Sequence, residues 1–424
     1  MRRMNKNNIL LIFPKLGPYD NIIRDMPLSL IYASRLARKQ GFSLTVIDQR
    51  TRKNWRDEIL KELKNKPVLA GISVMTGKPI GYALEISKFI KDNSNVTVVW
   101  GGIHPTLLPE QTIENSSIDI LVKGKGETTL CELSLALSNS KSLSCIPGIS
   151  YKQDNRIIHN QDRVSPDFFD FSLPDYDLVD YSDYSRFDSM ERFFSILTSH
   201  GCPHRCGFCY NVSYGKRKWE PEPIDTVIKH LKFVMEKYHP TYFSVIDSDF
   251  FVDLGRVTAL FEKIISFGWK VRFGFRGVRV DDMFRCSDKL FSLMEIAGVK
   301  HLHIGAESGS QRMLDLMCKD IKVEQTIEVN KRLKRFPSIK PTYNFFSGIP
   351  TETQEDIRIT TDLILNLIKV NPNCLITAYN QFTPYPGTSL FDLAIKHGLI
   401  PPKKLEEWIE FDQAEFAKKS PWLS

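Results

Sequence analysis

Strand-like and helix-like segments alternate along most of the chain, and this alternation restricts the possible folds more than any other feature. In the first third, short apolar runs predict strands at residues 9–13, 44–48, 68–74, 96–100 and 118–122. The amphipathic segments between them predict helices at 28–40, 55–64, 80–91 and 127–137. Strands that alternate with helices form a parallel sheet with helices on both faces. We therefore predict an α/β domain, Rossmann-like and doubly wound, over residues 1–145.

A second alternation of the same kind begins near residue 193. It predicts strands at 194–198, 242–246, 271–275, 302–305, 342–346 and 376–382. Helices are predicted between them at 224–237, 255–267, 288–297, 311–317, 323–335 and 355–369. A complete barrel of this type needs eight strand–helix units. We therefore predict a partial (β/α)6 TIM barrel over residues 191–395.

Two shorter segments complete the predicted organisation. Residues 146–190 are rich in Pro, Asp and aromatic side chains, and we expect a linker that contains a hairpin near residues 148–158. Residues 396–424 are expected to form a short C-terminal tail that docks through Trp408 and Trp422.

Charge and hydropathy exclude several functional classes. The formal net charge is +7, and the basic residues are scattered, so no nucleic-acid partner is expected. No segment approaches the roughly 18 to 20 consecutive apolar residues that span a bilayer. The apolar run at 9–13 is also too short for a signal peptide. We expect a cytoplasmic protein without a membrane association.

Three of the eight cysteines lie within eight residues, in the sequence Ser199-His-Gly-Cys-Pro-His-Arg-Cys-Gly-Phe-Cys-Tyr210. A compact loop with three thiolates can bind three irons of a cubane cluster and leave the fourth iron open for chemistry. The alternative is a zinc site with His200 or His204 as fourth ligand. Structural zinc usually takes two pairs of ligands from separate turns, and no second pair follows here. The spacing therefore favours an iron–sulfur cluster.

The Cys-x3-Cys-x2-Cys spacing resembles that of the radical S-adenosylmethionine (SAM) superfamily. The resemblance implies a 4Fe-4S cluster on Cys202, Cys206 and Cys209, with Phe208 near the adenine of SAM. It also implies reductive cleavage of SAM to a 5′-deoxyadenosyl radical that abstracts hydrogen from a substrate. An external electron donor such as flavodoxin or ferredoxin would then be a partner.

Further motifs follow the predicted strands in the order typical of this superfamily. Asp247 and Asp249 stand in Asp-Ser-Asp-Phe, where related chains have Asp-Asp-x-Phe, and we expect Asp247 to accept a hydrogen bond from the SAM ammonium. The alternative for this motif is a helix N-cap. The other residues that the resemblance assigns to the cofactor are Arg279, Glu307, Ser308, Gly348 and Thr383.

The first domain resembles the cobalamin-binding domain that precedes many radical SAM domains. Gly101 and Gly102, in Gly-Gly-Ile-His-Pro-Thr, are expected to let the cofactor approach the backbone. The Asp-x-His-x-x-Gly motif that supplies an axial histidine is missing from the loop at 13–20, so no lower histidine is expected from it. His104 matches the family's Gly-Gly-x-His turn and is expected to be structural. The alternative is a Rossmann-like domain that has lost its cofactor.

The main functional prediction is cobalamin-dependent methyl transfer to an unactivated carbon of a small-molecule substrate. The alternative is a radical SAM dehydratase, deoxygenase or cyclase, with cobalamin absent or not methylating. A further alternative is a non-catalytic redox or cobalamin sensor. The sequence does not identify the substrate.

Overall fold

The computed structural model describes residues 7–21, 25–164, 172–184, 191–412, 416 and 419–423. The chain divides into two compact units, the first formed by residues 1–184 with 401–412 and the second by 185–400 with 413–424. The predicted C-terminal tail is thus shared between the units. Residues 165–171 and 185–190 of the predicted linker lie outside the described part. The described residues contain no helix that is long and apolar enough to cross a membrane.

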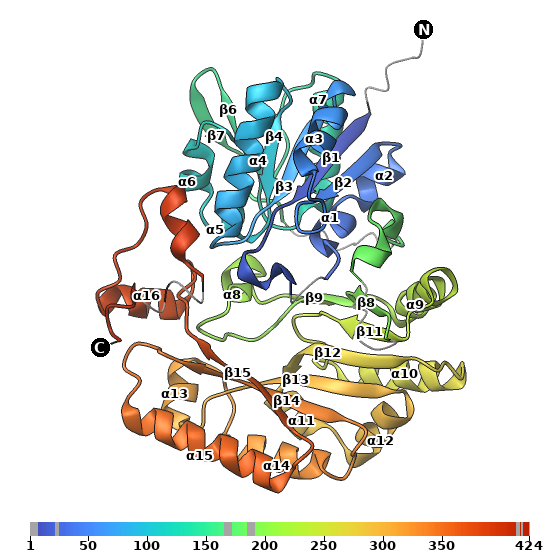
Figure 1. Ribbon diagram of the computed structural model, residues 1–424, viewed down its shortest axis with the longest axis vertical. Helices are drawn as coiled ribbons and strands as arrows, with labels where there is room; N and C mark the ends of the chain where they lie inside the picture. Colours follow the sequence, from blue (N-terminus) through green and yellow to red (C-terminus); the bar gives the residue numbers. More distant parts are fainter. Residues whose placement is uncertain are drawn as a thin grey trace. The chain divides into compact units, whose positions relative to one another are not determined.

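The first unit contains a seven-stranded sheet with the order β2-β1-β3-β4-β5-β6-β7 (Figure 1). Its strands are β1 Asn8–Phe13, β2 Ser43–Asp48, β3 Leu69–Ser73, β4 Val98–Gly101, β5 Ile120–Val122, β6 Ile149–Gln153 and β7 Arg156–His159. Its helices are α1 Leu28–Ala33, α2 Arg35–Lys39, α3 Trp55–Lys64, α4 Pro79–Asn93, α5 Ile103–Leu107, α6 Pro109–Glu114 and α7 Gly126–Ser138. Short 3₁₀ turns lie at Pro18–Asn21, Tyr176–Leu178, Tyr181–Asp183 and Leu405–Glu410.

The five strands predicted in this unit pair in parallel, and the predicted hairpin adds β6 and β7 in antiparallel pairing. Strand β1 lies between β2 and β3, and its residues Ile9–Ile12 are buried because the sheet is covered on both faces. The helix predicted over 28–40 is wrong in one respect, since it is interrupted at Ser34. The Ser34 hydroxyl donates to the Ile31 carbonyl, a local bond that competes with helix geometry.

The second unit contains a six-stranded parallel sheet with the order β15-β14-β13-β12-β11-β8. Its strands are β8 Phe193–Ile196, β11 Tyr242–Val245, β12 Arg272–Arg279, β13 Val299–Glu307, β14 Lys340–Ser347 and β15 Leu375–Gln381. A separate small ladder joins β9 Ser199–Gly201 to β10 Trp219–Pro221. The helices are α8 Asn211–Tyr214, α9 Ile224–Tyr238, α10 Leu254–Ser266, α11 Val280–Arg285, α12 Asp288–Ile296, α13 Gln311–Leu316, α14 Val323–Leu333, α15 Gln354–Val370 and α16 Ser389–Lys396.

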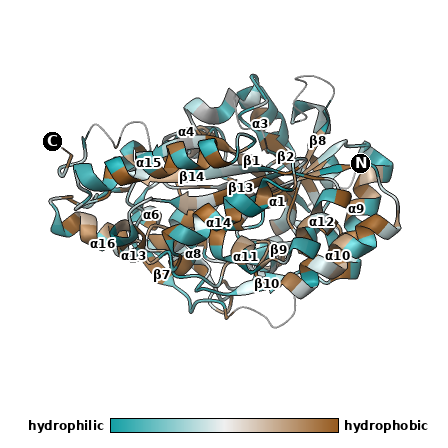
Figure 2. Ribbon diagram, turned by 90° about the horizontal axis from the view of Figure 1, so that it is seen from below, coloured by the Kyte–Doolittle hydropathy of each residue, from teal (hydrophilic) through white to brown (hydrophobic). Residues whose placement is uncertain are grey.

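One face of this second sheet packs on helices. Phe273 and Phe275 of β12 lie against Leu231 of α9 and Phe261 of α10, together with neighbouring aliphatic side chains. Figure 2 shows α10, α14 and α15 with hydrophobic and hydrophilic residues on different sides, as expected for helices that cover a sheet. The six predicted strands and the partial-barrel architecture are confirmed. Strands β12 and β13 are longer than predicted, and their ends bring polar residues to the carboxyl edge of the sheet.

Candidate active site

The cysteine loop begins after β9, at a turn that only glycine fits. Gly201 has a φ of +76°, and a Cβ there would lie 2.1 Å from the Lys218 carbonyl oxygen of the paired segment. Backbone bonds fix the middle of the loop: the Gly207 N–H donates to the Met317 carbonyl at 2.7 Å, and the Gly207 carbonyl accepts from the Leu390 N–H at 3.0 Å. The loop is therefore held by parts of the chain that are far away in sequence.

Cys202, Cys206 and Cys209 lie close enough for their charges to interact. Burial raises the pKa of Cys202 to about 12, and the charges of Asp249, Cys209 and Cys206 add to the rise. Burial also raises the pKa of Cys209. Thiols that burial protects from deprotonation, as it does at Cys202 and Cys209, need a bound cation to become thiolates. This donor set fits the three protein ligands of a 4Fe-4S cluster.

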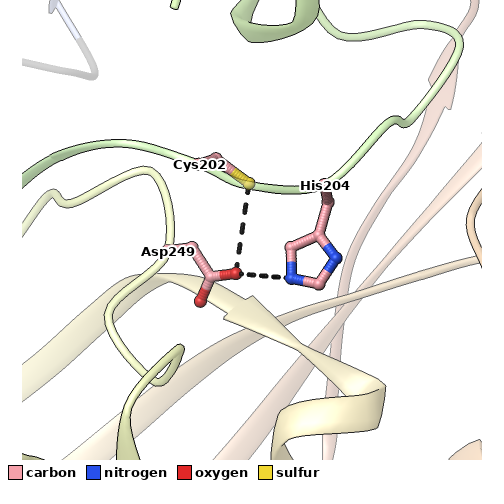
Figure 3. A group of neighbouring side chains, drawn as sticks. All are labelled: Cys202, His204 and Asp249. Atoms are coloured by element: carbon pink, nitrogen blue, oxygen red, sulfur yellow. Dashed lines mark hydrogen bonds and ion pairs between the residues drawn. The ribbon is translucent and has the colours of Figure 1, made fainter. Parts of the chain in front are cut away.

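Asp249 faces the cysteine loop (Figure 3). Its Oδ2 lies 4.0 Å from the Cys202 Sγ and 3.2 Å from the His204 Nε2. The Asp249 side chain is fully buried, and its backbone carbonyl accepts from the Trp219 Nε1 at 3.0 Å. His204, which could complete a zinc site in the alternative prediction, therefore has a carboxylate partner.

Asp247, which was expected to bind the SAM ammonium, forms hydrogen bonds within the protein instead. Its carboxylate accepts from the Thr198 N–H at 2.7 Å, the Thr198 hydroxyl at 2.6 Å and the Ser199 hydroxyl at 2.6 Å. Burial raises the pKa of Asp247, although these three donors oppose the rise. The geometry thus makes Asp247 a connection between the ends of β8 and β11. Of the two carboxylates, Asp249 is the one that lies near the cysteines.

A buried set of charges lies beside the cysteine loop. The Arg279 Nη1 donates to the Cys206 Sγ at 3.1 Å. Lys319 and Glu307 form a buried ion pair of 2.6 Å. A Cβ at Gly305 would lie 2.2 Å from the Glu307 Oε1 and 2.7 Å from the Lys319 Nζ, so glycine leaves room for this pair. Burial lowers the pKa of Lys319, but the charges of Glu307 and Cys206, with the hydrogen bond to Glu307, together outweigh this effect and raise it.

Phe208 connects the cysteine loop to the end of β14. Its ring centroid lies 4.9 Å from that of Phe346, and the Lys319 Nζ lies 5.8 Å from the Phe208 centroid. Gly348, two residues after Phe346, has a φ of +77°, and its carbonyl accepts from the Trp422 Nε1 at 2.8 Å. The structure therefore brings Phe208, Phe346 and the Lys319–Glu307 pair together.

Two other predicted cofactor residues differ in their surroundings. The Thr383 side chain is 5% exposed, and its hydroxyl has no hydrogen-bond partner among the described residues, which suits a polar ligand atom. Ser308 instead bonds to Thr360 of α15 at 3.1 Å and accepts from the Ser310 N–H. Ser308 therefore stabilises the start of α13 and its contact with α15. The sequence gives no sign of this partner.

In the first unit, the two predicted glycines have different requirements. Gly102 has a φ of +108°, and a Cβ there would lie 2.7 Å from the Val74 carbonyl oxygen. At Gly101 a Cβ would meet only Val122, at an ordinary 3.7 Å. Gly101 ends β4 and Gly102 follows it, at the carboxyl edge of the parallel strands, where this type of sheet binds ligands. At Gly124, which follows β5, a Cβ would meet nothing within 4 Å.

His104 lies in the same turn, and its Nε2 has no hydrogen-bond partner among the described residues. It is fully buried, its Nδ1 lies 3.1 Å from the Thr76 hydroxyl, and its ring packs edge-on against Trp408. Burial lowers its pKa to about 3, so the imidazole is neutral.

Sequence reasoning missed Lys319 and did not connect His204 with Asp249. Lys319 stands in no motif, and only the need to balance a buried Glu307 could have suggested a cation nearby.

Two families match the chain. The radical SAM superfamily matches residues 196–364, and the B12 binding domain matches residues 26–134. An uncharacterized methyltransferase of Pyrococcus horikoshii is 30% identical over 411 residues, which cover 94% of this chain and 85% of the relative. The anaerobic magnesium-protoporphyrin IX monomethyl ester cyclase of Rubrivivax gelatinosus is 24% identical, with 86% of this chain and 65% of the cyclase covered.

The same fold occurs in solved structures. The radical S-adenosylmethionine methyltransferase TsrM of Kitasatospora setae superposes with a TM-score of 0.74 at 19% identity, over 92% of this chain and 75% of that chain. The cobalamin-dependent S-adenosylmethionine radical enzyme OxsB gives a TM-score of 0.74 at 19% identity, over 93% and 61%. The chain therefore belongs to the radical SAM superfamily, in the branch in which a B12-binding domain precedes the radical SAM domain.

Proposed function

We propose that this protein is a cobalamin-dependent radical SAM methyltransferase that acts on a small molecule. The observation that carries the proposal is the convergence of Cys202, Cys206 and Cys209 at the carboxyl edge of a parallel sheet, in a chain that also matches the B12 binding domain. Two solved structures share this fold: TsrM with cobalamin and a 4Fe-4S cluster bound, and OxsB with cobalamin and SAM bound.

The cysteines are the ligands that would hold the cluster, which supplies the electron for cleavage of SAM when it is bound. Asp249 lies beside Cys202 and can accept a hydrogen bond from a cationic group placed there. The rings of Phe208 and Phe346 form an apolar surface next to the loop. Thr383 offers its hydroxyl at the end of β15.

In the first unit, the turn after β4 and the open space at Gly124 are the places where a corrinoid could approach the backbone. Cobalamin would supply a methyl carrier between SAM and the substrate. Because His104 is buried and neutral, and because the loop at 13–20 contains no histidine, we do not assign a lower histidine ligand to either segment.

The substrate is proposed to be polar. In β12, Phe273 and Phe275 face the helices, and the exposed Arg276 follows them at a register shift between β12 and β13. The charge of Arg276 reaches His303 of β13, where burial first and this charge second lower the histidine pKa to about 4. A cation close to a neutral imidazole suits a hydrophilic small molecule. The electron is proposed to come from flavodoxin or ferredoxin.

Anaerobic reconstitution tests this proposal. The wild-type chain, expressed with added cobalamin, is expected to retain cobalt, to contain about four irons, and to consume SAM when dithionite is added. Cys202→Ala, Cys206→Ala and Cys209→Ala should each lose the cluster. Cys318→Ser, which changes a partly buried thiol of the same unit, should keep it. A wild-type chain that holds no iron, or that retains no cobalt, would contradict the proposal.

Cyclisation or dehydration is the second candidate, because three related cyclases match the chain at 24% identity. SAM labelled in its methyl group separates the two. Label in the product indicates methyl transfer, and an unlabelled, altered substrate indicates the alternative.

A further inference from the structure

Arg279 ends β12 with its side chain bonded on three sides. Nη1 donates to the Cys206 Sγ at 3.1 Å, Nη2 donates to the Lys319 carbonyl at 2.6 Å, and Nε donates to the Asp281 Oδ1 at 2.9 Å. Only 5% of the residue is exposed. A planar guanidinium with two anchored edges has little freedom, so its third edge is fixed toward the sulfur.

The anchors also connect Arg279 to the segment that carries the cysteine loop. Met317, two residues before Lys319, accepts the Gly207 N–H, and Gly207 directly follows Cys206. Arg279 and the Met317–Lys319 segment therefore hold the same part of the loop, one through a side chain and the other through the backbone. Removal of the guanidinium would leave this part of the loop with its backbone hydrogen bonds and without a side-chain donor to the Cys206 sulfur.

The charge of Arg279 is directed at the thiol. The neighbouring Lys319 and Glu307 neutralise each other as a buried pair. Asp281, whose side chain is 24% exposed, offsets Arg279 on the Nε side, and the charge of the buried Asp249 also reaches the guanidinium. A guanidinium stays protonated in proteins, so the Arg279 side chain is cationic. A fixed cation in a buried site acts with much less screening than one in water.

We propose that Arg279 is a positioning residue for the cluster ligand Cys206 and that its charge raises the reduction potential of the cluster. This inference rests on the proposed function, because it requires the cluster. Reduction adds one electron from a low-potential donor and forms no bond, so the site becomes more negative by one charge. The guanidinium at 3.1 Å from the sulfur stabilises this more negative state relative to the oxidised state. The resemblance to the family had assigned Arg279 to the cofactor SAM; the contact found here is with the cysteine.

The test is a dithionite titration of the reconstituted full chain without SAM, followed by electron paramagnetic resonance. Arg279→Gln removes the charge. Arg279→Lys keeps a positive charge but lacks the planar guanidinium that donates to three partners at once. Arg205→Gln is the matched control, since Arg205 lies in the same loop but is 57% exposed and pairs with Asp320 at 2.8 Å. Iron and sulfide content are measured for every variant.

Arg279→Gln is expected to lower the ratio of reduced to oxidised cluster at least tenfold at the wild-type midpoint, which is about 59 mV for a one-electron couple. Arg279→Lys should fall between it and the wild type, and Arg205→Gln should stay near the wild type. If Arg279→Gln does not retain its iron, the midpoint potential of Arg279→Lys tests the inference instead. Wild-type midpoints in both Arg279 variants, or an equal shift in Arg205→Gln, would refute this inference alone. A wild-type chain without a cluster would refute the proposed function, and this inference with it.

Discussion

At the scale of single residues, a carboxylate beside the cysteine loop can serve the fold or the cofactor, and hydrogen-bond partners separate the two roles. Asp247 accepts three bonds from Thr198 and Ser199. Asp247→Ala would leave these donors without an acceptor, and we expect the free energy of unfolding to fall by about 3 kcal/mol. Iron content after reconstitution should fall too, because Ser199 begins β9, which leads into the cysteine loop.

Thermal unfolding and iron analysis check this prediction. Asp247→Asn is the matched variant, and it should recover part of the stability because the two hydroxyl groups can rotate to accept from the amide. Unchanged stability in Asp247→Ala would show that Asp247 does not connect the two strand ends.

A second prediction at this scale concerns the buried His104. Burial depresses its pKa to about 3, so the native state excludes a proton that the unfolded state binds near pH 6.5. Burial of the neutral histidine therefore costs no proton-binding free energy above pH 6.5. The free energy of unfolding falls as the pH decreases from 6.5 toward 3. Between pH 7.5 and pH 5 we expect His104 to account for a loss of about 2 kcal/mol.

Urea unfolding of the wild type and of His104→Gln at both pH values measures this contribution. Glutamine cannot take up a proton, so the variant should lose about 2 kcal/mol less than the wild type on acidification. Equal losses in the two proteins would mean that His104 is protonated in the native state.

At the scale of elements, the turn after β4 separates a glycine that the backbone needs from one that it does not. Gly102 has φ +108° and ψ −164°, which is essentially restricted to glycine, and its Cβ position is blocked by Val74. Gly102→Ala should destabilise the first unit by about 3 kcal/mol. Gly101→Ala should change stability by less than about 1 kcal/mol, because its Cβ has normal contacts.

Thermal melts of the two alanine variants test the contrast on adjacent residues. Cobalt retention in Gly101→Ala then reports on cofactor access without a loss of stability. Equal melting temperatures for the two variants would contradict the backbone argument.

Most elements could be predicted because packing on the two sheets requires apolar residues at the buried positions. This requirement produces the periodic pattern that identifies strands and helices in the sequence. The misses have local causes. Ser34 interrupts the first helix through a side-chain bond that hydrophobic periodicity does not reveal. The ladder of β9 and β10 has too few residues to produce an alternating pattern, and α11 directly follows β12 without a loop that would mark its start.

At the scale of the whole molecule, the order of motifs predicted the location of the site because parallel strands bring their carboxyl ends to one edge. The roles within that edge could not be predicted. Asp247 and Asp249 are two residues apart in the sequence, and only the tertiary partners Thr198 and His204 distinguish them. Likewise, Lys319 becomes important only because the fold buries Glu307 beside it.

The C-terminal residues return to both units, and this division gives the last prediction. Trp408 is 1% exposed in the first unit and donates to the Gln111 side chain at 2.9 Å. Trp422 belongs to the second unit and donates to the Gly348 carbonyl at 2.8 Å. Trp408→Ala should therefore destabilise the first unit by about 4 kcal/mol and reduce cobalt retention, with little effect on iron content.

Trp422→Ala is the reciprocal variant. It removes a contact to the turn at Gly348, so it should reduce SAM affinity and leave cobalt retention unchanged. Calorimetry of the full chain, with metal analysis and equilibrium binding of SAM, measures all of these effects. If both variants lowered cobalt and SAM binding alike, the two units would unfold as one, and the separate packing of Trp408 and Trp422 would not determine which cofactor is lost.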